Sequence, residues 1–321
     1  MKLAFVFPGQ GSQAVGMLDS IADRPEVAAL IAEADAALGE SLSGLIHAGP
    51  AEALALTVNT QPAMLLAGLA CYRAWIAAGG PDAAAVAGHS LGEYTALTAA
   101  GAFEPGAALR LVRLRAQAMQ EAVPVGSGGM AAILGLDDDQ VRAACRQANE
   151  SFAGQPPTVA GVADVVEPAN FNAPSQVVIA GSKAAVERAC EAAKALGAKR
   201  AMPLPVSAPF HSSLLRPAGE RLAVALRETV PTTPRIPLVN NVDVAVAAEP
   251  AGIVDALVRQ SYSPVRWVEV VKRLESMGVD RIVEFGPGKV LAGLVKRIAP
   301  GVAVSAVTDA ASLEAVLKEI A

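Results

Sequence analysis

Short apolar runs alternate with amphipathic segments along this chain, and the alternation predicts a mixed α/β fold. Apolar runs at 3–7, 83–87 and 281–285 are typical of strands that are buried on both faces. The helix at 60–78 is expected to start at Thr60, with Pro62 in its first turn. We expect further strands at 236–239 and 302–307, and further helices at about 24–38, 50–57, 93–100, 212–229, 250–260, 264–277 and 312–320.

The pattern changes after the glycine-rich stretch 126–129. We expect there, in order, strand 130–136, helix 137–149, strand 158–166, strand 176–181, helix 183–196 and strand 199–206. This βαββαβ order is that of a ferredoxin-like unit. The sequence therefore predicts a small subdomain at 128–205, with a flexible insertion at 152–163, between the two parts of a discontinuous larger subdomain at 1–127 and 206–321.

Composition narrows the class of protein. Hydrophobic residues make up 53% of the 321 residues, yet no apolar run approaches the length of a membrane span. The apolar start of the chain is too short for a signal peptide, so we expect a cytoplasmic protein. Cys71, Cys145 and Cys190 are widely spaced and suggest neither disulfides nor a metal site. The net charge of −5 argues against general nucleic-acid binding.

Gly88-His89-Ser90-Leu91-Gly92 lies between a predicted strand and a predicted helix. G-x-S-x-G in that context indicates a nucleophile elbow, although the same pattern also arises by chance in glycine-containing chains. The turn is so sharp that side chains at Gly88 and Gly92 would collide with the neighbouring strand and helix. Ser90 would stand at a helix N-terminus, where developing negative charge is stabilised.

A serine nucleophile needs a base, and the chain has three histidines, His47, His89 and His211. His89 adjoins Ser90, so its side chain should leave an extended backbone in a different direction. His47 lies upstream of the elbow and is expected on the surface or as a helix cap. His211 follows the nucleophile in a loop, as the base does in Ser-first hydrolase folds. His211 is therefore the candidate base, against the alternative of an ordinary solvated histidine.

Arg115 lies in the middle of an apolar helix face after Pro105. A lone buried charge costs several kcal/mol, so the guanidinium must reach solvent, pair with a carboxylate or bind an anionic ligand. Its closeness in sequence to the elbow favours a ligand. The other members of that face are Ala108, Leu111, Val112, Ala118, Met119 and Ala122.

Several motifs together resemble those of malonyl-CoA:acyl carrier protein transacylase. They run in the same order from residue 3 to about residue 298, so the resemblance covers nearly the whole chain. It implies an α/β-hydrolase-like large subdomain with an inserted ferredoxin-like (βαββαβ) small one. The motifs are Phe7-Pro8-Gly9-Gln10-Gly11-Ser12-Gln13, Gly88-His89-Ser90-Leu91-Gly92-Glu93-Tyr94, Val112-Arg113-Leu114-Arg115, Asn170-Phe171-Asn172, Phe210-His211-Ser212, Gln260-Ser261-Tyr262-Ser263-Pro264-Val265-Arg266-Trp267 and Glu284-Phe285-Gly286-Pro287-Gly288-Lys289-Val290-Leu291.

The resemblance implies a role for each matching residue. Ser90 attacks the thioester of malonyl-CoA, and His211 accepts its proton and returns it to the leaving thiol. The backbone N–H groups of Leu91 and Gln10 form the oxyanion hole. Arg115 holds the malonyl carboxylate through a bidentate pair.

Two further roles follow from the same resemblance. Gln260 offers a main-chain carbonyl that orients His211, where hydrolases use an aspartate. In agreement, the aspartates between Ser90 and His211 all lie in the inserted unit, which favours a Ser–His dyad. Phe210 resembles the residue of the malonyl-selective version of the family and would clash with a branched extender.

The implied reaction is ping-pong transfer of malonyl from coenzyme A to Ser90 and then to the phosphopantetheine thiol of acyl carrier protein, for fatty-acid or polyketide synthesis. It needs no metal and no redox cofactor. The partners are malonyl-CoA and the carrier, with no nucleic acid or membrane, and we expect a monomer. A serine esterase or thioesterase is the alternative, disfavoured by Arg115, and a non-catalytic scaffold for carrier proteins is a third.

Overall fold

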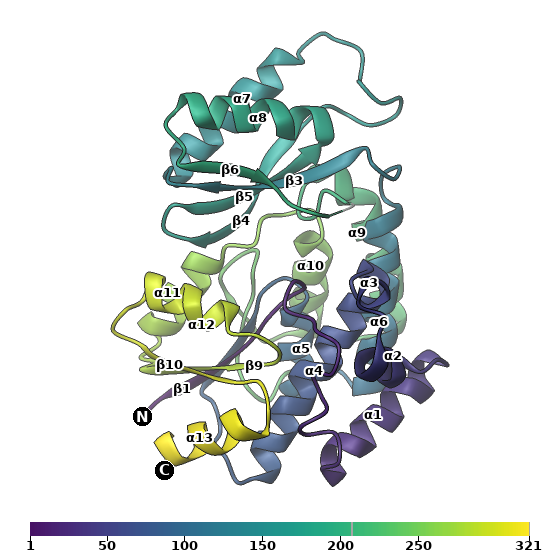
Figure 1. The fold of residues 1–321 in the computed structure, drawn as a ribbon, viewed down its shortest axis with the longest axis vertical. Coiled ribbons are helices and arrows are strands. Elements are labelled where there is room, and N and C mark those ends of the chain that lie inside the picture. The colour runs from purple at the N-terminus through teal and green to yellow at the C-terminus, as the bar shows by residue number, and fades with distance from the viewer. Residues whose placement is uncertain (207, 321) are drawn as a thin grey trace.

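The computed structural model describes residues 1–206 and 208–320, so Ser207 and Ala321 lie outside the described residues. Within that part of the chain, two β-sheets form, which makes the fold mixed α/β. Figure 1 shows the sheet that carries α7 and α8 at one end of the molecule and the sheet that carries α13 at the other. The N-terminus and α13 lie at the second end.

The larger sheet has the strand order β10-β9-β1-β2-β7-β8. Its neighbouring strands are parallel except for β7 and β8, which are antiparallel. Every residue of the central strand β1 is buried, as expected where helices cover both faces of a parallel sheet. The six strands are β1 (Leu3–Phe7), β2 (Ala85–Gly88), β7 (Leu238–Val239), β8 (Val246–Ala247), β9 (Arg281–Phe285) and β10 (Ala303–Val307).

Alternate residues of β1 face two different cores. Phe5 and Phe7 pack with α1, α4 and α5, whereas Ala4 and Val6 pack with α11 and α12. The strand periodicity of two thus sorts the side chains between the two helical layers. The helices of this part are α1 (Pro25–Leu38), α2 (Leu42–Ala48), α3 (Ala51–Leu54), α4 (Thr57–Ala77), α5 (Gly92–Ala99), α6 (Pro105–Glu121), a 3₁₀ turn (Ser213–Leu215), α9 (Arg216–Glu228), α10 (Pro250–Gln260), α11 (Trp267–Ser276), α12 (Val290–Ile298) and α13 (Ala310–Ile320).

The smaller sheet is antiparallel, with the strand order β4-β5-β3-β6. Its elements follow in the chain as β3 (Gly128–Leu134), α7 (Asp138–Ser151), β4 (Val166–Ala173), β5 (Gln176–Ser182), α8 (Lys183–Ala195) and β6 (Arg200–Pro203). Helices α7 and α8 share a core with one face of this sheet. Another apolar cluster joins Met130 and Val178 of the sheet to Met119 of α6 and Ala218 of α9. The small sheet therefore packs directly on helices of the larger part.

Strand β4 also joins the two parts through the backbone. Phe171 N–H donates to the Val265 carbonyl, and Val265 N–H donates to the Ala169 carbonyl, each at 2.9 Å. At the turn between β4 and β5, Arg297 of α12 donates to the Pro174 carbonyl at 2.9 Å and to the Gln176 side chain. The edge strand β4 of the small sheet is thereby fixed against the larger part of the molecule.

The order of the larger elements is confirmed, but several boundaries were wrong. The predicted strand at 158–166 lies instead at Val166–Ala173, because Asn170 and Asn172 interrupt the apolar pattern that marks a strand. Residues 158–165 form no strand of the sheet. Val159 and Val162 close a turn through an isolated bridge, and the Asp164 carboxylate accepts from Thr158 and Ser182. Helix α2 and strand β8 were not predicted, and the helix expected at 50–57 spans only Ala51–Leu54.

Two helix starts were also wrong. Helix α4 begins at Thr57, so Pro62 lies inside the helix rather than in its first turn. The buried Thr60 hydroxyl donates to the Leu54 carbonyl at 2.6 Å instead of capping the helix. Helix α11 begins at Trp267 and not at 264, because Val265 is paired with β4. No helix among the described residues is both long enough and apolar enough to cross a membrane.

Candidate active site

The elbow predicted at 88–92 has the geometry that its glycines suggested. Strand β2 ends at Gly88, α5 begins at Gly92, and Ser90 between them has a φ of 54°. A Cβ at Gly88 would lie 1.9 Å from the backbone carbon of Gly92. A Cβ at Gly92 would lie 2.0 Å from the carbonyl oxygen of Phe7 on β1. Only glycine fits at these two positions, and the tight turn presents Ser90 at the first turn of α5.

The structure brings His211 to Ser90 and holds it from the other side. His211 Nε2 lies 2.7 Å from Ser90 Oγ, and Nδ1 lies 2.8 Å from the main-chain oxygen of Gln260. Because a carbonyl only accepts, Nδ1 carries the proton and Nε2 is free to accept from the serine hydroxyl. Burial, and next the charge of Arg115, lower the pKa of His211 to about 3, so the imidazole is neutral near pH 7.

The other two histidines are engaged elsewhere. His89 Nε2 lies 2.8 Å from Asn172 Oδ1 on β4, and the imidazole ring packs edge-on against Trp267. His47 is on the surface, as predicted, where its Nδ1 lies 2.9 Å from Asp19 Oδ1. The choice of His211 among the three thus agrees with the geometry.

Arg115 is only 1% exposed, so its guanidinium does not reach solvent. Nη1 donates to Gln61 Oε1 at 2.7 Å, and Nη2 donates to Ser90 Oγ at 3.1 Å and to Gln260 Oε1 at 3.0 Å. Its Nε has no partner among the described residues, and its Cζ lies 5.3 Å from the centroid of the Tyr94 ring. In the described part of the chain, no carboxylate hydrogen-bonds to this cation. The guanidinium charge therefore lies beside Ser90 Oγ, and without a carboxylate partner it is able to bind an anionic ligand.

Sequence reasoning missed a buried polar network behind the elbow. The Asn241 side chain accepts from Ser90 N–H at 2.8 Å and donates to the Gly88 carbonyl at 2.7 Å. Glu93 Oε2 accepts from the Asn241 main-chain N–H at 3.0 Å and from Gln260 Nε2 at 2.9 Å. Gln260 Nε2 also donates to the Ser90 carbonyl at 3.0 Å. The side chains of Asn241, Glu93 and Gln260 together fix the elbow backbone. The sequence offered one signal of this network, because Glu93 is the charged residue in the otherwise uncharged segment of α5.

The two residues predicted for the oxyanion hole lie at the elbow or in the turn beside it. Leu91 is buried and immediately precedes α5. Gln10 follows β1 in a turn whose Gly9 approaches the elbow so closely that a Cβ there would lie 2.8 Å from the His89 carbonyl oxygen. The structure thus brings both chain segments to Ser90, while the roles of the two amide groups stay predictions.

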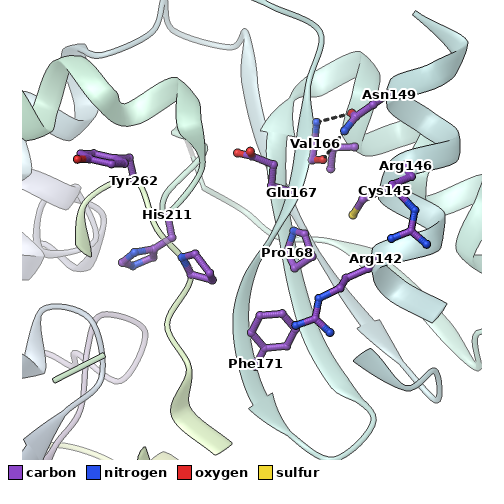
Figure 2. Close-up of a pocket in the computed structure, with 11 residues that line it drawn as sticks. Arg142, Cys145, Arg146, Asn149, Val166, Glu167, Pro168, Phe171, His211 and Tyr262 are labelled. Carbon is purple, nitrogen blue, oxygen red and sulfur yellow. Dashed lines mark hydrogen bonds between the residues drawn. The ribbon is translucent and has the colours of Figure 1, made fainter. Parts of the chain in front are cut away.

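A cavity of about 390 Å³ extends from His211 along β4 to α7 (Figure 2). Figure 2 shows Arg142 lying over the ring of Phe171 on the side away from His211, and the guanidinium carbon is 4.7 Å from the ring centroid. Near His211, the Glu167 carboxylate accepts from Ser213 N–H at 2.6 Å. Phe210 is 5% exposed and belongs to the apolar cluster between the two parts. The lining residues are Arg142, Cys145, Arg146, Asn149, Val166, Glu167, Pro168, Phe171, His211, Tyr262 and Pro264.

The chain is similar to known proteins over nearly its whole length. The model of the acyl transferase domain family matches residues 4–312. The malonyl CoA-acyl carrier protein transacylase of Salmonella typhimurium is 52% identical over 319 residues, covering 99% of each chain, and that of Bacillus subtilis is 43% identical over 321 residues, covering 99% of this chain and 97% of the relative.

Solved structures are similar over the same length. The acyl-carrier-protein S-malonyltransferase of Burkholderia pseudomallei is 59% identical with a TM-score of 0.93, covering 99% of this chain and 100% of that chain. A malonyl-transacylase in complex with its type II PKS acyl-carrier protein is 48% identical with a TM-score of 0.93 and the same coverage. At this coverage the similarity extends over both sheets and the helices that pack on them.

Proposed function

The chain belongs to the acyl transferase domain family, and we propose that it transfers a malonyl group from malonyl-CoA to the phosphopantetheine thiol of an acyl carrier protein. The observation that carries this function is the buried guanidinium of Arg115, 3.1 Å from the hydroxyl oxygen of Ser90. An acyl group that ends in a carboxylate suits a nucleophile with a fixed cation beside it. A simple esterase has no use for that charge.

In the first half-reaction, His211 Nε2 takes the proton from Ser90 as Oγ bonds to the thioester carbon. The Leu91 and Gln10 backbone amides stabilise the resulting oxyanion. The intermediate then collapses, the carbon–sulfur bond breaks, and His211 returns the proton to the thiol of coenzyme A. Ser90 is left as a malonyl ester. The Gln260 carbonyl keeps the imidazole in the required tautomer, which makes this a Ser–His dyad.

The second half-reaction runs the same steps with the carrier. His211 removes the proton of the phosphopantetheine thiol, the sulfur attacks the ester carbon, and Ser90 leaves with the proton. Because the donor thioester is already activated, we propose that neither a metal nor a redox cofactor takes part. Arg115 binds the malonyl carboxylate throughout, and the ring of Phe210 beside His211 excludes branched extenders.

The cavity of Figure 2 is the path we propose for the pantetheine arm that both substrates share. It leads from His211 past Glu167 and Pro168 to the Arg142 guanidinium, which suits an arm with its thiol at one end and a phosphate at the other.

The finer description of the fold is also part of the proposal. The antiparallel order β4-β5-β3-β6, with α7 and α8 on one face, supports a ferredoxin-like subdomain at 128–205. The remaining parts, 1–127 and 206–321, are assigned to an α/β-hydrolase-like subdomain, supported by the elbow between β2 and α5. We further propose a cytoplasmic monomer with no nucleic-acid or membrane partner, on the strength of the sequence alone.

Intact mass spectrometry tests the function directly. Incubation with malonyl-CoA should add one malonyl group to the wild-type chain, and addition of holo acyl carrier protein should remove it and yield malonyl-carrier. Ser90→Ala should form no adduct, and His211→Ala should form it orders of magnitude more slowly. Steady release of coenzyme A without carrier, and without a lasting adduct, would instead identify a thioesterase.

A further inference from the structure

One buried ionisable group beside the nucleophile takes no part in the chemical steps above. Glu93, in the first turn of α5, is 1% exposed. Burial raises the pKa of this carboxyl to about 7. Burying a carboxyl is unfavourable unless it is hydrogen-bonded. Its hydrogen bonds within the described part of the chain are made by Oε2, and they lead to Asn241 and Gln260.

We propose that Glu93 is a positioning residue that fixes the side-chain amide of Gln260 and, through it, the guanidinium of Arg115. The two hydrogens of Gln260 Nε2 point to Glu93 Oε2 at 2.9 Å and to the Ser90 carbonyl at 3.0 Å. With both hydrogens used in this way, Gln260 Oε1 faces Arg115 Nη2 at 3.0 Å. Glu93 therefore acts on the acyl-binding cation without touching the substrate.

The opposite orientation of the amide is excluded by the same contacts. A rotated Gln260 amide would present its N–H groups to the Arg115 donors. It would also present its oxygen to the Glu93 carboxylate and to the Ser90 carbonyl. Each of these contacts would join two donors or two acceptors in a buried site, which is strongly unfavourable. Glu93 Oε2 accepts from Nε2 when the carboxyl is ionised, and it can still accept when a proton sits on Oε1, which has no partner in the described part of the chain. The ionised form is the stronger acceptor and holds this orientation most firmly.

Gln260 contacts Arg115 through its side chain and His211 through its main chain. Its side-chain oxygen accepts from Arg115, whereas its main-chain oxygen accepts from His211 Nδ1 at 2.8 Å. Loss of the Glu93 carboxyl frees the amide but leaves the main-chain carbonyl on His211. Selection of the malonyl carboxylate should therefore suffer more than the reactivity of Ser90.

The test uses two variants of Glu93 and a matched buried carboxyl. Glu93→Met removes the acceptor at similar volume, and Glu93→Gln keeps an oxygen that can accept from both partners. Glu284 is the control, because it is also fully buried and, among the described residues, its oxygens accept only from Leu291 and Ala292 N–H of α12. For each protein, kcat/KM is measured for acylation by malonyl-CoA and by acetyl-CoA. The rate of Ser90 sulfonylation by phenylmethanesulfonyl fluoride is measured beside them.

Glu93→Met should lower the malonyl-to-acetyl ratio of kcat/KM by about tenfold or more, the effect of one lost buried hydrogen bond at a charged group. Its sulfonylation rate should stay within about threefold of wild type, and Glu93→Gln and Glu284→Gln should keep the wild-type ratio within about threefold. Gln260→Ala should lower the ratio as Glu93→Met does, and the double variant should fall no further, because the two changes act through one contact.

This inference rests on the proposed function, and the two fail in different ways. A wild-type chain that forms no malonyl adduct would overturn both. A wild-type chain that forms the adduct, with a Glu93→Met variant that keeps the malonyl-to-acetyl ratio, would overturn only the role of Glu93. Equal losses for malonyl-CoA, acetyl-CoA and phenylmethanesulfonyl fluoride, or additive effects with Gln260→Ala, would show that Glu93 merely supports the elbow.

Discussion

Arg115 and Ser90 are in direct contact, with the guanidinium Nη2 donating to the hydroxyl oxygen at 3.1 Å. The same oxygen lies 2.7 Å from His211 Nε2, so it is held between a cation and a neutral base. The cation favours negative charge on the oxygen as the proton leaves. It is also close enough to meet a carboxylate carried by an acyl group on that oxygen. We therefore propose that Arg115 acts both on the nucleophile and on the choice of acyl group.

The low pKa of His211 predicts an unusual pH profile. The base must be neutral, and an ordinary histidine with a pKa of 6.5 would leave only about one molecule in 30 neutral at pH 5. Since burial lowers the pKa of His211 to about 3, kcat/KM for malonyl-CoA should change less than about twofold between pH 5 and pH 8 on account of this residue.

The profile should be recorded in Glu93→Gln as well, because the Glu93 carboxyl has a pKa of about 7 and could add an inflection of its own. Arg115→Ala, assayed with acetyl-CoA, removes the second cause of the shift and should move the acid limb toward higher pH. A fall of tenfold or more between pH 7 and pH 5 in Glu93→Gln would contradict a neutral, buried His211.

The central residues of the candidate site could be predicted from the sequence, because each carries a local signal. Ser90 lies in a strand–turn–helix motif, His211 remained after elimination, and Arg115 interrupts an apolar helix face. Helix periodicity alone could not choose between solvent, an ion pair and a ligand for Arg115. That choice required Gln61 and Gln260, which lie 54 and 145 residues away in the chain.

The supporting network could not be predicted in the same way. Glu93 and Asn241 are 148 residues apart, and Glu93 and Gln260 are 167 residues apart. Such contacts depend on how β7 and α10 meet the elbow, which no local pattern encodes. Strand β4 was misplaced for a related reason, since its polar Asn172 contacts His89 of the elbow rather than solvent. When polar residues of a strand contact another part of the fold, they interrupt the apolar pattern from which that strand would be predicted.

The elbow glycine predicts a sharp difference between two substitutions. In Gly92→Ala the added methyl would lie 2.0 Å from the Phe7 carbonyl oxygen, so β1 and α5 must move apart. We expect the free energy of unfolding to fall by more than about 3 kcal/mol, together with loss of Ser90 reactivity.

Gly293→Ala is the matched control, because Gly293 is an exposed helical glycine where an added methyl would meet no described atom within 4 Å. Alanine there should raise the free energy of unfolding by roughly 0.5–1 kcal/mol. Urea denaturation of the three proteins makes the comparison. Equal stabilities for Gly92→Ala and the wild type would mean that the elbow is not as tight as described.

The exposed residue Arg216 predicts where the carrier protein docks. Arg216 begins α9, and its guanidinium carbon lies 4.8 Å from the centroid of the Tyr262 ring. Tyr262 lines the cavity that extends from His211. Acyl carrier proteins are typically acidic, so a net-negative enzyme needs local basic residues at this entrance. Arg216→Glu should raise KM for the carrier about tenfold at low salt and spare acylation by malonyl-CoA.

Arg227→Glu provides the control, because this exposed arginine lies in the last turn of the same helix. Lys199, Arg200 and Lys289 are also exposed, and each can be reversed in the same assay. Carrier kinetics at several salt concentrations separate the possibilities. If Arg216→Glu and Arg227→Glu behave alike, the docking surface lies elsewhere.

The choice of acyl group gives the most discriminating prediction. Arg115 is fully buried, its hydrogen bonds in the described part of the chain are to neutral oxygens, and its Nε has no partner there. A malonyl carboxylate would complete the charge pair, whereas an acetyl group would leave the guanidinium without one. A site built for a polar group can reject an analogue lacking that group by roughly 10⁴-fold. Arg115→Ala should therefore lose malonyl transfer. It should keep or gain acetyl transfer, because the space left suits a methyl group.

Two further substitutions test whether malonyl transfer needs only a positive charge at position 115 or the planar guanidinium with its paired N–H donors. Arg115→Lys should recover little malonyl transfer, because an ammonium cannot donate in parallel to both carboxylate oxygens while contacting Gln61 and Gln260. Arg110→Ala, at an exposed position of the same helix, should leave both donors unaffected. Acyl-enzyme formation from malonyl-CoA and acetyl-CoA is measured side by side in each variant. Equal losses for the two donors in Arg115→Ala would make the arginine structural, and the preference for malonyl would then need another source.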